Sequence, residues 1–176
     1  MNNKKNILRF QIISAIFIAI LGTLLHFTYG WSNQNLLVGA FSAVNESTWE
    51  HLKLLFFPYL LTIIFGYFYI GKDNSNFICT KTLGVMVSIL FTIIFFYTSA
   101  GILGFNLATL NIATFYIAII LGEYIAYKLM ISNFNCNNKL AITILIILTL
   151  SFIFFTYFTP QIGLFKDPLT SEYGII

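Results

Sequence analysis

The chain has 176 residues, of which 59% are hydrophobic and 9% are charged, and its 9 basic and 6 acidic residues give a net charge of +3. This composition excludes an ordinary soluble domain and is typical of a protein that crosses a membrane several times. The basic residues flank the apolar runs, so the positive charge indicates a membrane surface and no nucleic-acid partner.

Five apolar segments reach the length of about 20 residues that a bilayer-spanning helix needs. They are residues 8–28, 53–71, 83–103, 108–130 and 140–159. A further apolar run at residues 36–44 is too short to span and is expected to be a re-entrant or interfacial segment. The pattern predicts an all-α bundle of about five transmembrane helices, forming a single domain over residues 1–176.

The distribution of lysine and arginine predicts the orientation, because these residues are enriched on the cytoplasmic side. With a cytoplasmic N-terminus, seven of the nine basic residues lie inside: Lys4, Lys5, Arg9, Lys72, Lys81, Lys128 and Lys139. Only Lys53 and Lys166 then lie outside. We therefore expect a multi-pass protein with its N-terminus in the cytoplasm and its C-terminus outside. The first span has no cleavage site after it and is interpreted as a retained anchor.

The first span carries Gly22, a small residue that lets a neighbouring helix approach closely. It ends near His26, and Trp31 follows in a position that suits the aromatic belt of the outer interface. A histidine at this depth is either a hydrogen-bonded structural group or part of a site.

The most polar stretch of the chain, Asn-Glu-Ser-Thr-Trp-Glu-His-Leu-Lys at residues 45–53, leads into the second span. Ser47 and Glu50 form a capping-box pattern that predicts a helix start here. We expect Glu46 and Glu50 to share one face of this helix, and Glu50 to pair with Lys53 three residues on. Helix capping does not account for Glu46 and His51, and this surplus of ionisable groups favours a functional site.

The remaining spans offer fewer signals. Pro58 is expected to kink the second span and to free a backbone carbonyl. Glu123 is an intramembrane acid, which we expect to bond Tyr127 or to extend to the inner headgroups. The third span, residues 83–103, is predicted to face lipid. Cys79 and Cys136 fall in predicted cytoplasmic loops and are expected to be reduced.

The tail, residues 160–176, contains Asp167-Pro168, a pattern typical of a helix start, and several apolar residues that need a partner. These residues are Phe165, Leu169, Tyr173, Ile175 and Ile176. We expect the tail to fold as a lid over the loop at residues 29–53 and to bring Asp167 or Glu172 towards His26, His51 and Lys53.

The string N-E-S-x-W-E-H-x-K, with a histidine at the end of the preceding helix and an F-x-D-P tail, resembles a family of small integral membrane proteins. That family is a domain of unknown function from low-GC Gram-positive bacteria, and the resemblance covers nearly the whole chain. It implies a bacterial cell membrane and no particular reaction. It also implies that the family's marked positions are Asn45, Glu46, Ser47, Trp49, Glu50, His51 and Lys53.

Two functional hypotheses follow. The first is a membrane-embedded hydrolase or transferase that acts on a lipid or lipid-linked substrate by acid–base or metal chemistry. Its catalytic residues would be Glu46, Glu50, His51 and Lys53. Its substrate-binding residues would be Asn45, Trp49, Trp31 and Asp167. A divalent metal could be held by His26, Glu46, Glu50 and His51.

The second hypothesis is a small-solute transporter or the membrane substrate-binding subunit of one, without catalysis. Transporters commonly have internal repeats and a polar site near the membrane midplane. This chain shows no internal repeat and little midplane polarity, which counts against the second hypothesis. A structural or sensory partner is a third reading, and two histidines could also bind haem.

Overall fold

The computed structural model describes residues 2–132 and 134–175. Its helices are α1 (Asn2–Trp31), α2 (Leu36–Gly39), α3 (Thr48–Tyr69), α4 (Phe77–Leu103), α5 (Ala108–Ile131) and α6 (Asn138–Tyr157). All except α2 are long and apolar enough to cross a membrane. The predicted class, an all-helical membrane bundle of five spans, is confirmed. The run at residues 36–44 forms the single turn of α2 and a loop.

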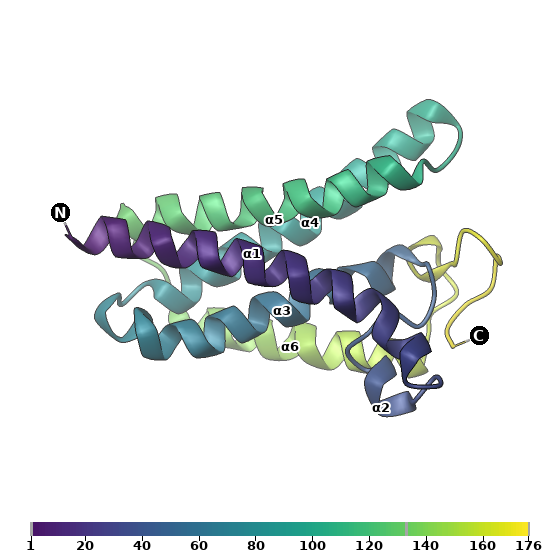
Figure 1. The fold of residues 1–176 in the computed structure, drawn as a ribbon, viewed down its shortest axis with the longest axis horizontal. Helices are drawn as coiled ribbons and strands as arrows, with labels where there is room; N and C mark the ends of the chain where they lie inside the picture. Colours follow the sequence, from purple (N-terminus) through teal and green to yellow (C-terminus); the bar gives the residue numbers. More distant parts are fainter. Residues whose placement is uncertain (1, 133, 176) are drawn as a thin grey trace.

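The long helices run antiparallel in chain order, and the two termini lie at opposite ends of the bundle (Figure 1). Helix α3 is the central element and contacts α1, α4 and α6. We call the end where α1 finishes and α3 begins the C-terminal end, because the tail lies there. At this end the α4–α5 hairpin leans away from the other helices (Figure 1).

Helices α3 and α4 begin five and six residues earlier than the spans that hydropathy predicts, at residues 53 and 83. Helix α3 starts at Thr48 because Ser47 caps it, its hydroxyl accepting a hydrogen bond from the Glu50 amide. Helix α4 starts at Phe77, because polar residues of its first turns, including Lys81, are buried inside the bundle. Hydropathy assigns such residues to water and so places the boundary too late.

A close approach of α1 and α3 lies about two turns from the C-terminal end. Pro58 lacks an amide hydrogen and so cannot bond the carbonyl of Leu54, four residues earlier. That carbonyl instead lies against Gly22 of α1, where any Cβ would collide with it. Gly22 and His26 share one face of α1, so this contact brings His26 next to the first turns of α3.

The N-terminal half of the bundle contains a buried ion pair that corrects two sequence predictions. Lys81 Nζ lies 2.5 Å from Glu123 Oε1 and 3.3 Å from Gln11 Oε1, and the Lys81 side chain is 0% exposed. Its ammonium also lies 4.4 Å from the centre of the Tyr59 ring. Glu123 therefore pairs with Lys81, not with Tyr127 or the headgroups, and α4 is not simply lipid-facing.

The two cysteines are joined in a disulfide, which corrects the prediction that both are reduced. Cys79 lies in the first turn of α4, and Cys136 lies in the loop before α6. The bond ties these two elements together at the N-terminal end of the bundle.

Candidate functional site

The polar stretch folds as a loop followed by the first turn of α3. The side-chain oxygen of Asn45 accepts a hydrogen bond from the Ser47 amide at 2.9 Å, which forms a tight turn just before the helix. Because α3 begins at Thr48, Glu46 lies outside the helix and does not share a face with Glu50. The loop directs Glu46 to the side of α3 that carries His51.

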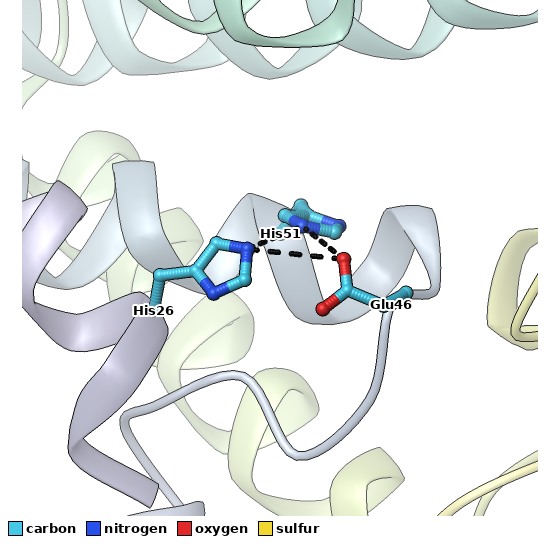
Figure 2. Close-up of side chains that lie close together, drawn as sticks. All are labelled: His26, Glu46 and His51. Carbon is cyan, nitrogen blue, oxygen red and sulfur yellow. Dashed lines mark hydrogen bonds and ion pairs between the residues drawn. The ribbon is translucent and has the colours of Figure 1, made fainter. Parts of the chain in front are cut away.

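His26, Glu46 and His51 form a compact cluster at the C-terminal end of the bundle (Figure 2). The Nε2 atoms of the two histidines are 3.3 Å apart. Glu46 Oε2 lies 3.3 Å from His51 Nε2 and 3.8 Å from His26 Nε2. The three side chains are 34–40% exposed, so the cluster is accessible from outside the bundle.

The histidines set the charge state of Glu46. A hydrogen bond from His51 and the positive potential of His51 and His26 hold the pKa of the Glu46 carboxyl below its ordinary value of 4.5. Partial burial opposes this shift and is the weaker influence overall. The two histidines therefore favour the carboxylate form of Glu46.

Glu50 and Lys53 face the opposite side of α3 and do not reach the cluster. They form an ion pair with Lys53 Nζ 2.5 Å from Glu50 Oε2, and their side chains are at most 4% exposed. Lys53 also donates to the Gly39 carbonyl at 2.7 Å and to the Thr156 hydroxyl at 2.8 Å. Glu50 accepts from the Val44 amide at 3.0 Å. The predicted ion pair is present, and its partners tie α2, α3 and α6 together.

The tail is folded onto the polar stretch, as the sequence predicts. Asp167 Oδ2 accepts a hydrogen bond from the Glu46 amide at 3.0 Å, and Asn45 donates to the Gly174 carbonyl at 2.7 Å. Asp167 Oδ1 accepts from the amides of Leu169 and Thr170, so Asp167 closes a turn and does not start a helix. Asp167 and Asn45 thus hold the loop around Glu46.

The tail's apolar residues behave less uniformly than expected. Phe165 is buried and packs on Trp49, with ring centroids 4.7 Å apart. Leu169 is 80% exposed and Ile175 is partly exposed. Ile176 lies outside the described residues.

The two tryptophans have different surroundings. Trp49 packs between α6 and the tail, against Phe152 and Phe165, and so joins the tail to the bundle. Trp31 is 68% exposed and stacks on Phe27, whose ring lies beside that of His26. Trp31 is therefore at the rim of the cluster, whereas Trp49 is a packing residue.

The sequence analysis missed several contacts that shape these sites. The carbonyl of Ser47 lies 3.0 Å from His51 Nδ1, and Thr156 donates to Glu50 from a distant helix. Gln11 and Tyr59, beside the Lys81–Glu123 pair, belong to ordinary apolar runs. Only the polar side chain of Gln11 in the middle of an apolar span indicated that this residue has a buried partner.

One comparison with known proteins found a match. A family model described as "Family of unknown function (DUF6512)" matches residues 1–175. The chain belongs to this family. The family assignment agrees with the resemblance seen in the sequence and adds no activity. Neither the comparison with curated proteins nor that with solved structures found a match.

Proposed function

We propose that this DUF6512 protein is a membrane-embedded hydrolase or transferase that acts on a lipid or lipid-linked substrate at the outer face of a bacterial cell membrane. The observation that carries the proposal is the convergence of His26, Glu46 and His51 in a half-exposed cluster. The cluster is formed by the last turns of α1, the loop before α3 and the first turn of α3, which is the depth of lipid headgroups in a bundle of this length.

The cluster has the groups that acid–base chemistry needs. His51 can take a proton at Nε2 from a water molecule or a substrate hydroxyl while its Nδ1 is held by the Ser47 carbonyl. The Glu46 carboxylate, 3.3 Å away, stabilises the imidazolium that forms. The deprotonated oxygen then attacks the carbonyl carbon or phosphorus atom of the substrate, and the bond from that atom to the leaving oxygen breaks. The leaving oxygen takes up the proton held by the His51 imidazolium.

The surroundings favour an amphiphilic substrate. Phe27 and Trp31 present exposed aromatic surface next to His26. Aromatic side chains of this kind lie at the membrane interface, where they contact both headgroups and acyl chains. A lipid could therefore place its polar bond at the cluster without leaving the bilayer.

The test is lipid turnover in liposomes that contain the purified protein and defined phospholipids or polyprenyl phosphates, followed by mass spectrometry. Loss of a general base typically lowers a rate by about 10²- to 10⁴-fold, so His51→Ala should abolish measurable turnover. Glu172→Gln removes an exposed carboxyl of the tail and is the matched control. Turnover in His51→Ala equal to that of the unmodified protein would exclude this mechanism.

A second candidate is a small-solute transporter or its membrane substrate-binding subunit, and the buried Lys81–Glu123 pair favours it. Charged residues within a bilayer are costly and often line transport pathways. Within the described residues, Gln11 Nε2 beside this pair has no hydrogen-bond partner and could contact a solute. Solute uptake that is lost in Glu123→Gln but retained in His51→Ala would favour transport over the enzyme.

A further inference from the structure

The atoms that converge in the cluster need a positive charge between them. A carbonyl oxygen only accepts hydrogen bonds, so His51 Nδ1 carries the proton that it shares with Ser47, and Nε2 of a neutral His51 carries a lone pair. Glu46 Oε2 is also an acceptor, yet it lies 3.3 Å from that Nε2 atom. Two lone pairs this close repel unless a proton or a metal ion lies between them.

The spacing of the three atoms fits a metal ion. The separations are 3.3 Å, 3.3 Å and 3.8 Å, and the point equidistant from the two Nε2 atoms and Glu46 Oε2 lies about 2.0 Å from each. Zinc binds imidazole nitrogen and carboxylate oxygen at about 2.0–2.2 Å, which places tetrahedral ligands about 3.4 Å apart. We propose that His26, Glu46 and His51 bind one divalent transition-metal ion of the Zn²⁺ class.

The ligand types select the class of ion. Two imidazoles and one carboxylate suit Zn²⁺, Fe²⁺ and Co²⁺, whereas Mg²⁺ and Ca²⁺ require oxygen ligands. Three protein ligands leave a coordination position open, as in catalytic metal sites. The partial exposure of all three side chains lets water or a substrate oxygen reach that position. This inference rests on the proposed function but changes the role of His51. With the ion bound, His51 Nε2 would be a ligand, and the ion in place of His51 would activate the water by lowering its pKa.

Two further contacts hold the ligands in place. The Ser47 carbonyl accepts from His51 Nδ1 at 3.0 Å and so fixes the tautomer that exposes Nε2. Asp167 accepts from the Glu46 amide at 3.0 Å and so fixes the backbone from which the carboxylate projects. Figure 2 shows Glu46 extending from this loop towards both histidine rings. Asp167 is thus a positioning residue for the metal site and not one of its ligands.

The first experiment measures metal content without reference to activity. The full-length protein, purified in detergent through a tag without histidine, is stripped with a chelator and titrated with Zn²⁺ or Co²⁺ at pH 7. We expect one ion per chain, uptake that excess Mg²⁺ does not prevent, and a Co²⁺ visible spectrum typical of four-coordinate nitrogen and oxygen ligation. Binding should release protons and weaken at low pH, because the ion displaces the proton shared in the cluster.

Variants then assign the site. His26→Ala, Glu46→Gln and His51→Ala should each lose the stoichiometric ion, whereas Glu172→Gln should keep it. Asp167→Ala should lower the affinity by about 10- to 100-fold, as loss of a contact that orients a ligand does. The Asp167→Asn variant keeps one acceptor oxygen and should bind the metal ion more tightly than the Asp167→Ala variant does. Circular dichroism and gel filtration establish that each variant is folded.

Two results would overturn the metal site. One is an unmodified protein that takes up less than stoichiometric Zn²⁺ and Co²⁺, which would leave a proton as the only occupant. The other is a folded His51→Ala variant that binds the ion as tightly as the unmodified protein. Neither result would bear on lipid turnover, which His51 and Glu46 could support by proton transfer alone. Conversely, stoichiometric metal without turnover would support the site and reject the reaction.

Discussion

At the scale of single residues, the two carboxylates of the polar stretch have opposite environments although they are four positions apart. Glu46 is partly exposed between two imidazoles, whereas Glu50 is buried against an ammonium group. The exposed carboxylate can exchange protons or ligands with its surroundings. The buried carboxylate has both oxygens bonded, by Lys53 and Val44 on one side and by Thr156 on the other. Its contribution is therefore to stability.

Glu46 predicts a pH dependence. The pKa of Glu46 in the folded protein is lowered from the ordinary value of 4.5. The carboxylate therefore contributes its full stabilisation above pH 4.5, and this stabilisation is lost as the pH falls through the pKa of the folded protein. Thermal unfolding of the metal-free protein should show Glu46→Gln less stable than the unmodified protein at pH 6, with the difference shrinking between pH 4.5 and pH 3. Glu172→Gln is the control. A difference that is constant over this range would contradict the prediction.

The Lys53–Glu50 pair predicts a large stability effect. Lys53→Met leaves the buried Glu50 carboxylate without its counter-charge, and breaking such a pair costs about 3–5 kcal/mol. The variant should melt well below the unmodified protein, whereas Lys166→Met, at an exposed tail position, should not. Replacing both partners, Glu50→Leu with Lys53→Met, should recover part of the loss, because no charge is then left buried. An unchanged melting temperature for Lys53→Met would show that the pair is not stabilising.

The residue types at the candidate site were predictable from sequence, but their partners were not. The crowding of acids and histidines in residues 45–53 indicated a site, and His26 was placed at the correct depth. The prediction that Glu46 and Glu50 share one helix face is wrong, because the helix begins at Thr48 and Glu46 precedes it. Hydrogen bonds to backbone carbonyls, such as that of Ser47, have no residue-type signal at all.

At the scale of helices, the contact between Gly22 and the carbonyl of Leu54 determines how closely α1 approaches α3. It lies one turn below His26 on α1 and one turn beyond His51 on α3. A larger distance between α1 and α3 would move the imidazoles of His26 and His51 apart. The small residue was predictable as a contact point, and Pro58 as a source of a free carbonyl. That the two features meet required the three-dimensional arrangement.

Gly22→Ala should therefore destabilise the bundle. The added Cβ would collide with the backbone of α3, which cannot move aside as a flexible side chain can, and overpacking of this kind costs about 1–3 kcal/mol. Gly30→Ala, in the same helix but with nothing within 4 Å of the place that its Cβ would take, should be neutral or slightly stabilising. Thermal unfolding of the two variants in one detergent provides the comparison. Equal melting temperatures would show that α1 adjusts without cost.

At the scale of the whole molecule, the two buried lysines change the basis of the predicted orientation. Lys53 and Lys81 neutralise carboxylates inside the bundle and carry no information about sides of the membrane. Without them, six basic residues lie at the N-terminal end and Lys166 alone lies at the other. The asymmetry is thus stronger than the simple count. Hydropathy could not reveal the Lys81–Glu123 pair, because that pairing depends on which helices become neighbours.

This asymmetry predicts an N-terminus in the cytoplasm and a C-terminus outside. Single cysteines at Thr170 and Lys72, both exposed, can be introduced into a protein with Cys79→Ser and Cys136→Ser. A membrane-impermeant maleimide added to intact cells should label position 170 and should label position 72 only after lysis. The reverse pattern would invert the topology and place the cluster on the cytoplasmic face.

The hydrogen bond between Glu46 and Asp167 joins residues 121 positions apart. The chain is made from its N-terminus, so His26, Glu46 and His51 are synthesised long before Asp167 exists. A product that stops after α6 would contain all five spans and all three cluster residues, yet its Glu46 loop would lack its anchor. The Glu46 loop therefore gains this anchor only after the tail has been synthesised, and a chain that stops after α6 lacks it.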